Sequence, residues 1–167
     1  RQKGTLRSLL TTPTSHATIL FSTILGQVLV ALVQMLLLVG FGMLVMGIEW
    51  GRSPAALALM LTSSALAAAA LGTTLGTFVK TESQANGLSI MLGMVMALLG
   101  GCWYPLELFP QAVQSAVKVL PTTWAMEGLL NIVVRGGGVN AVLPQVAVLC
   151  GFALIFFVIG IWRFRYE

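Results

Sequence analysis

Four long apolar stretches separated by short polar segments dominate the pattern of hydrophobic and polar positions in this chain. They cover residues 15–48, 54–79, 81–103 and 139–162. Since an α-helix rises about 1.5 Å per residue, roughly 20 apolar residues cross a hydrocarbon layer of about 30 Å. The first stretch is longer than one crossing needs, which favours a tilted or protruding helix. The pattern predicts an all-α, polytopic membrane helix bundle with four transmembrane helices.

The composition supports a membrane protein. Of the 167 residues, 57% are hydrophobic and 8% are charged, whereas an average soluble domain carries about 25% charged residues. The length suits one bundle rather than two sizeable domains. The chain begins at Arg1 without the features of a secretory signal peptide, and we expect it to be part of a longer polypeptide.

The basic residues are distributed unevenly around the four stretches. Six of them fall on one side: Arg1, Lys3, Arg7, Lys80, Arg163 and Arg165. The other side receives Arg52, Lys118 and Arg135, each with a glutamate in the same loop, namely Glu49, Glu107 and Glu127. By the positive-inside rule both ends are cytoplasmic, and we expect the chain in the inner or plasma membrane of the cell. The net charge of +4 therefore indicates topology and contact with membrane lipid, not nucleic-acid binding.

The segment 104–138 does not fit a fifth crossing. Residues 122–134 look helical, but they are few, include Glu127 and follow three prolines. A fifth crossing would also move Arg163 and Arg165 to the outer side. We therefore predict short re-entrant helices that dip into the outer leaflet and return before the glycines at 136–138. Non-helical backbone at that depth requires a protein cover or a wet cavity, which indicates a functional feature beneath it.

Local signals mark the ends of two helices. Thr81 and Gln84 have the spacing of a capping box, which predicts that the third helix starts there. Pro54 fits the first turn of the second helix. Large amphipathic aromatic residues fall near the predicted membrane interfaces, namely Trp50, Trp103, Tyr104, Trp124, Trp162 and Tyr166.

The apolar stretches contain few side chains that could bind a polar ligand or take part in a reaction. No ionisable side chain falls in their central parts, which counts against an ion-coupled carrier. Gln27 and Gln34 are seven positions apart and share one helix face, where they serve either helix packing or a translocation path. Gly72 and Gly76 form a GxxxG pair typical of helix packing. The methionines suit either plain packing or a surface for apolar ligands.

Catalytic and metal-binding motifs are missing. One histidine and five glutamates provide no carboxylate pair, metal cluster or nucleophilic triad, and the glycines and threonines at 72–78 lack the end of a phosphate-binding loop. The two cysteines have no CxxC spacing. We therefore predict no catalytic, cofactor-binding or metal-binding residue and no enzymatic activity in this chain.

Four segments in order resemble permeases of the ATP-binding-cassette type 2 (ABC-2) exporter family. They are residues 3–13 (KGTLRSLLTTP), 80–86 (KTESQAN), 103–110 (WYPLELFP) and 121–129 (PTTWAMEGL), and the chain ends similarly with RFR at 163–165. The resemblance implies a six-span permease of which this chain holds the last four spans. It also implies that two permeases, identical or different, pair and dock on cytoplasmic ATPase subunits that use ATP and Mg²⁺.

The resemblance assigns a coupling helix to the region 1–14. The residues expected to contact the ATPase are Lys3, Leu6, Arg7, Leu9 and Leu10. The leucines form a stripe beside the two basic residues. The same pattern fits a basic helix lying on anionic headgroups, which remains the alternative.

The resemblance also places Glu107 and Glu127 at an outer gate over the exit of the path. There they open or close the exit, or receive a cationic substrate. Structural alternatives are ion pairs with Lys118 and Arg135, or caps on the short helices. One departure from relatives is that Arg135 follows Asn131, where relatives often place an arginine sooner.

Together these observations predict an ATP-driven exporter subunit that moves an amphipathic drug-like molecule, lipid or polysaccharide by alternating access. The alternatives are a carrier or channel without an ATPase and a membrane scaffold. Besides the coupling region, the expected parts are helices at 15–48, 54–79, 80–103 (with a cytoplasmic turn) and 139–162, outer segments at 49–53 and 104–138, and a cytoplasmic tail at 163–167.

Overall fold

The computed structural model describes residues 16–79 and 81–164. This part of the chain is all-α, as the sequence predicts. The order is α2 (His16–Leu44), α3 (Pro54–Phe78), α4 (Glu82–Leu99), η1 (Leu106–Leu108), α5 (Gln111–Ala116), η2 (Val117–Val119), α6 (Pro121–Val133) and α7 (Val139–Phe164), where η marks a 3-10 helix. The coupling residues Lys3, Leu6, Arg7, Leu9 and Leu10 lie outside the described residues.

Three of the described helices are long and apolar enough to cross a membrane: Phe21–Leu44 within α2, α3, and Val139–Trp162 within α7. The polar first turns of α4, with Glu82, Gln84 and Asn86, lower the hydropathy of that helix. Four crossings therefore remain a prediction. At 13 residues, α6 is shorter than the roughly 20 residues that a crossing needs, and its dip into the outer leaflet also remains a prediction.

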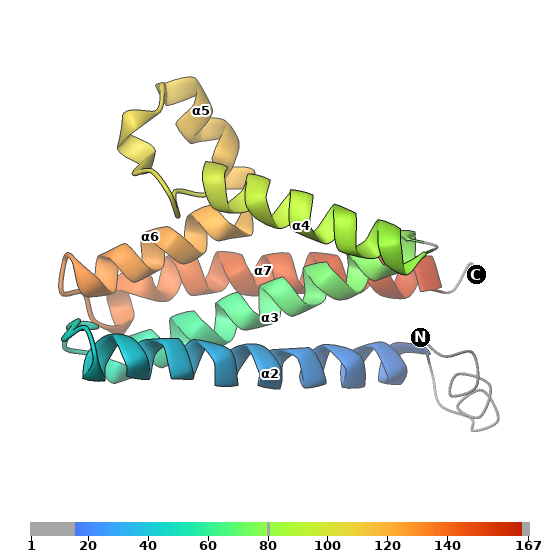
Figure 1. Ribbon diagram of the computed structural model, residues 1–167, viewed down its shortest axis with the longest axis horizontal. Coiled ribbons are helices and arrows are strands. Elements are labelled where there is room, and N and C mark those ends of the chain that lie inside the picture. Colours follow the sequence, from blue (N-terminus) through green and yellow to red (C-terminus); the bar gives the residue numbers. More distant parts are fainter. Residues whose placement is uncertain (1–15, 80, 165–167) are drawn as a thin grey trace.

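The long helices run along the same axis of the molecule (Figure 1). The start of α2 and the end of α7 lie at one end. The projecting α5 and the turn between α6 and α7 lie at the other, together with the loop that joins α2 to α3. This second end is the one that the charge pattern assigns to the outer side, and it carries every element of the segment 104–138.

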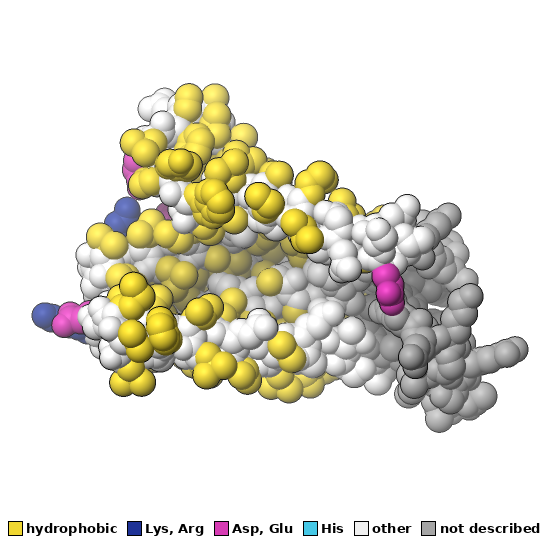
Figure 2. Space-filling view, in the orientation of Figure 1, with side chains coloured by type: hydrophobic (Ala, Val, Ile, Leu, Met, Phe, Trp, Pro, Cys, Tyr) yellow, Lys and Arg dark blue, Asp and Glu magenta, His cyan; other side chains and the backbone are white. Residues whose placement is uncertain are grey.

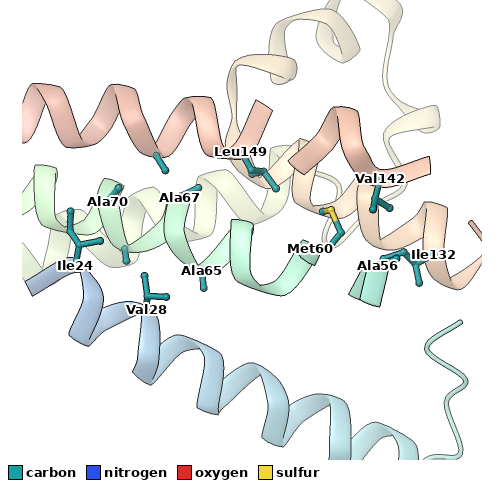
Figure 3. Packing of buried hydrophobic residues seen from close by; sticks show 12 residues of the cluster. Ile24, Val28, Ala56, Met60, Ala65, Ala67, Ala70, Ile132, Val142 and Leu149 are labelled. Atoms are coloured by element: carbon teal, nitrogen blue, oxygen red, sulfur yellow. The ribbon is translucent and has the colours of Figure 1, made fainter. Parts of the chain in front are cut away.

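The central helix of the bundle is α3, which packs most extensively against α7 and then against α2 and α6. Its buried face is rich in alanine, including Ala56, Ala65, Ala67 and Ala70, and small side chains let helix backbones approach closely. Larger side chains from the neighbours fill the remaining space (Figure 3): Ile24 and Val28 from α2, Ile132 from α6, and Val142 and Leu149 from α7.

The helices α3 and α6 approach each other closely in the core. Met60 and Ile132 are fully buried, and a side chain at Gly128 would collide with the terminal atoms of Met60. The two glycines that the sequence predicts to pack against another helix, Gly72 and Gly76, make no such close contact. A Cβ at Gly72 or Gly76 would meet nothing within 4 Å, so this GxxxG face contacts no other helix closely in the described part of the chain.

Local chemistry explains where the helices start. The side chain of Ser53 accepts a hydrogen bond from the backbone N–H of Ala56 at 3.3 Å, and Pro54 occupies the first turn of α3 as predicted. The side chain of Thr81 accepts a hydrogen bond from the N–H of Gln84 at 3.3 Å, which confirms the predicted start of α4.

Two helices end before their apolar stretches do. In each case a glycine in the left-handed region of backbone conformation follows the end of the helix. Helix α2 ends at Leu44, not at residue 48, because the chain turns through Gly47 with φ +64°. Helix α4 ends at Leu99, not at residue 103, since Gly101 has φ +86°. Apolar side chains continue past both ends, so hydrophobicity alone does not mark them.

Candidate functional site

The end of the bundle that carries α5, which the charge pattern predicts to be the outer one, contains an open pocket of about 470 Å³. The segment that follows α4 forms one side, and α5, η2 and α6 form the others. Both glutamates predicted for the outer gate, Glu107 and Glu127, line this pocket together with Lys118 and Arg135. Figure 2 shows acidic and basic side chains gathered at this end of the molecule. Four charged residues from four separate places in the chain thus share one cavity.

The four charged residues are not paired with one another. Within the described residues, neither glutamate forms an ion pair or a side-chain hydrogen bond with Lys118 or Arg135. A nitrogen of Arg135 donates instead to Oδ1 of Asn131 at 2.5 Å. No side chain caps η1 or α6. The described structure therefore contains neither structural alternative for the glutamates, ion pairing or helix capping.

Hydrogen bonds fix the elements that line the charged pocket. The hydroxyl of Thr123 donates to the carbonyl of Val117 at 2.7 Å. The indole N–H of Trp124 donates to the carbonyl of Lys118, also at 2.7 Å. Both bonds attach η2 to the first turn of α6, and Thr123 is buried. The backbone position of Lys118 relative to Glu127 is therefore set by contacts within one compact unit.

A second, largely apolar pocket of about 370 Å³ lies between α3, α4 and α6. Its lining includes Met35, Leu71, Leu92 and Met96, with the hydroxyls of Ser64 and Ser89. The pattern of apolar residues does not predict this pocket. A signal for it in the sequence is the run of alanines at 67–70 of α3 together with Gly72 and Gly93, which leave space beside α4. Of the methionines discussed above, Met60 packs in the core, while Met35 and Met96 face the pocket.

A contact between α4 and α6 separates the two pockets. The hydroxyl of Thr122 donates to the carbonyl of Met96 at 2.9 Å, and a side chain at Gly100 would collide with Thr122. Met96 is the buried residue of α4. Thr122 lines the apolar pocket, whereas the next residue, Thr123, lines the charged one. The first turn of α6 is therefore a wall shared by both cavities.

Gln27 and Gln34 lie on one face of α2, as their spacing predicts, and line a shallow groove of about 410 Å³ with Ser22, Thr23 and Gly26. Oε1 of Gln27 accepts a hydrogen bond from the hydroxyl of Thr73 on α3 at 2.9 Å, which is a helix-packing contact. Gln34 is exposed and has no hydrogen-bond partner within the described part. That Gln27 and Gln34 line a translocation path therefore stays a prediction.

Metal binding receives no support from the arrangement of side chains. No group of three or more histidine, cysteine, aspartate or glutamate residues converges among residues 16–79 and 81–164. The charged pocket provides two carboxylates, but it also brings two basic side chains close to them. Such a pocket is suited to charged or polar organic groups.

Comparison with known proteins places this arrangement in a family. The family model described as "ABC-2 family transporter protein" matches residues 1–162. The linearmycin resistance permease protein LnrN of Bacillus subtilis is 28% identical over 99% of this chain and 43% of its own length. The inner membrane transport permease YhhJ of Escherichia coli is 32% identical over 99% of this chain and 44% of its own length.

A third relative, the putative transport permease YvfS of Bacillus subtilis, is 29% identical over 96% of this chain and 64% of its own length. The chain thus spans less than half the length of the first two relatives. No solved structure matches it. The family match covers nearly the whole chain, includes the described helices up to residue 162 of α7 and agrees with a multi-pass membrane protein. The chain belongs to the ABC-2 family of transporter proteins, as a membrane permease component.

Proposed function

We propose that this chain is the membrane part of an ATP-driven exporter that moves an amphipathic drug-like molecule, lipid or polysaccharide out of the cytoplasm. The observation that carries the proposal is the pair of cavities on either side of the first turn of α6, one apolar and one charged. An amphipathic compound has an apolar part and a polar part, and on its way out it would meet first the apolar pocket and then the charged one. One relative is named for resistance to linearmycin, and a role in efflux agrees with that name.

The energy would come from a partner ABC ATPase that binds ATP and Mg²⁺. In this proposal the ATPase pair closes on ATP and pushes the coupling region 1–14 of each of two permease copies. The leucine stripe of Leu6, Leu9 and Leu10 would sit in a groove of the ATPase, flanked by Lys3 and Arg7. The two permeases would then rock from an inward-open to an outward-open arrangement.

The outer gate would be the charged pocket. Glu107 belongs to η1 and Glu127 to α6, so a movement of η1 relative to α6 changes the width of the exit between them. Gln27 and Gln34 would offer polar contacts along the path on α2. In such a path the hydroxyls and amides bind a substrate weakly enough to release it.

Two other functions remain as competitors. A carrier or channel without an ATPase normally relies on ionisable residues within the membrane, and none lies centrally in the predicted spans. A membrane scaffold needs no cavities at all, and the presence of two cavities on the shared wall favours transport over a scaffold.

The test is to purify the full-length parent permease from its native membrane in mild detergent and assay the preparation for ATP hydrolysis. The proposal predicts a stoichiometric ATPase whose turnover responds to added amphipathic compounds. A permease that is purified without any ATPase, from membranes in which all candidate ATPases are detected, would shift the assignment to a carrier or scaffold.

A further inference from the structure

We infer that the charged pocket at the outer end is a binding site for a zwitterionic amphiphile, a compound that carries one cationic and one anionic group next to an apolar chain. The inference rests on the proposed function in one respect, since it names the chemical class of compound that reaches the exit. The binding site itself follows from the arrangement of charges and is testable without ATP.

The formal charges of the four residues in the pocket sum to zero, but the charged groups are not paired with one another. Glu107 and Glu127 supply two negative charges, and Lys118 and Arg135 supply two positive charges. In the described part of the chain none of these four forms an ion pair with another. A ligand with a single charge would meet repulsion as well as attraction here. A ligand with both charges can satisfy a carboxylate and a basic side chain at the same time.

Each charge is held on a different element, which explains why the charges stay apart. Glu107 lies in η1, Lys118 in η2 and Glu127 in α6, while Arg135 follows the end of α6. The bonds from Thr123 and Trp124 fix η2 on α6. Arg135 is anchored to Asn131. Each of the four side chains therefore reaches the pocket from its own element, and a ligand with both charges can contact a carboxylate and a basic group there together.

The walls of the pocket suit the remainder of an amphiphile. Trp103 and Tyr104 line it and are 68% and 56% exposed. Aromatic faces attract ammonium groups, including quaternary ones. Leu106, Met126 and Leu130 add apolar surface. The volume of about 470 Å³ lies within the roughly 300–1,000 Å³ range of small-molecule sites, which suits a headgroup and the first part of its chain.

The first experiment measures binding without ATP. The full-length permease is placed in nanodiscs of anionic lipid, which contain no zwitterionic headgroup. Equilibrium dialysis then compares radiolabelled octylphosphocholine, octyl sulfate and octyltrimethylammonium, which share one chain length and differ in headgroup charge. We expect saturable binding of octylphosphocholine that is tighter than that of either singly charged probe. Equal affinity for all three probes would overturn the inference.

Single-charge variants sharpen this test because they predict gains as well as losses. Glu127→Gln and Lys118→Gln should each weaken octylphosphocholine binding by about tenfold, as loss of a charge-assisted contact predicts. Glu127→Gln should at the same time strengthen octyl sulfate binding, and Lys118→Gln should strengthen octyltrimethylammonium binding. A misfolded variant loses affinity for every probe and cannot produce these opposite gains.

The other outer loop provides the matched control. Glu49 and Arg52 are also exposed charges at this end of the molecule, but they line a neighbouring cavity that has Arg135 alone in common with the charged pocket. Glu49→Gln and Arg52→Gln should leave octylphosphocholine binding unchanged. Equal effects of the control and pocket variants would show that general surface charge attracts the probes, and would overturn the inference.

ATP turnover separates this inference from the proposed function. If octylphosphocholine binds in the pocket and stimulates a partner ATPase, both stand, and the ligand is a transported compound. If it binds with the predicted charge dependence but stimulates no ATPase, the pocket is a site for a lipid headgroup, and the exporter proposal loses its support. If amphiphiles of every charge stimulate turnover and Glu127→Gln changes nothing, the exporter stands and the zwitterion site is wrong.

Discussion

The hydroxyl of Thr74 on α3 donates a hydrogen bond to the backbone carbonyl of Phe156 on α7 at 2.6 Å. The neighbouring residue, Thr73, donates to Gln27 on α2. Two adjacent threonines of the central helix thus contact two different helices, α2 and α7. Because both threonines are buried, the bonds are shielded from competing water, and they fix the relative positions of α2, α3 and α7.

We predict that Thr74→Val destabilises the bundle by about 1 kcal/mol, the typical size of an interhelical hydrogen bond in a membrane. The valine keeps the shape of threonine and removes only the hydroxyl. Thr62→Val is the control, since the hydroxyl of Thr62 is exposed and bonds only within its own helix, to Ala58. Denaturant unfolding in detergent measures both variants, and equal stabilities of the two would contradict the assigned contact.

Gly128→Ala should destabilise the protein by about 1–3 kcal/mol, as overpacking of a core does. The added Cβ would collide with the Cε and Sδ atoms at the end of the Met60 side chain, and because Met60 is fully buried, this flexible end has to repack within the core. The double variant with Met60→Ala should be less destabilised than the sum of the two single changes, because the smaller side chain frees the space.

The control for this glycine is Gly151→Ala in α7, where a Cβ meets nothing within 4 Å. That substitution should be neutral or slightly stabilising, since alanine is the better helix former. Thermal unfolding of the variants in one detergent compares them. The α3–α6 contact would be wrongly described if Gly128→Ala proved as harmless as Gly151→Ala.

Replacement of Gln34 separates a transport role from a packing role. Gln34 is exposed and has no partner in the described structure, so Gln34→Leu should leave unfolding unchanged. If α2 lines the path, this variant should lower substrate-stimulated ATP turnover several-fold. Gln27→Leu should also lose stability, since it removes the bond from Thr73. Full turnover in Gln34→Leu would remove Gln34 from the path.

The coupling hypothesis concerns residues outside the described structure. Arg7→Glu combined with Leu9→Asp should uncouple ATP hydrolysis from transport while the permease remains inserted in the membrane, because both changes oppose docking in an ATPase groove. Basal ATPase activity and substrate transport are measured on the same preparation. An unchanged ratio of transport to hydrolysis would contradict a coupling role for this region.

The sequence predicts the helices better than it predicts the cavities. The start of α3 at Pro54 and of α4 after Thr81 follow from local capping chemistry, which a sequence displays directly. The ends at Leu44 and Leu99 differ from prediction because backbone conformation at Gly47 and Gly101 decides them, while apolar residues continue beyond.

Contacts between segments that are far apart in the sequence are harder to predict than helix ends. The charge pattern and the family resemblance predict an outer location for Glu107 and Glu127, but the pocket that they share with the unpaired Lys118 and Arg135 depends on how η1, η2 and α6 fold together. The apolar pocket beside α4 depends likewise on which face of α3 stays uncovered. The GxxxG pair favoured packing at Gly72, whereas Gly128, which belongs to no such pair, makes the closer contact.

The sharpest test of ATP-driven export is transport into inside-out membrane vesicles that contain the full-length permease and the proposed partner ATPase. A fluorescent amphiphile is added outside, and its accumulation inside is followed with ATP, with a non-hydrolysable ATP analogue, and with an imposed proton gradient but no ATP. We predict accumulation that requires hydrolysable ATP. Accumulation that follows the proton gradient and is indifferent to ATP would contradict it.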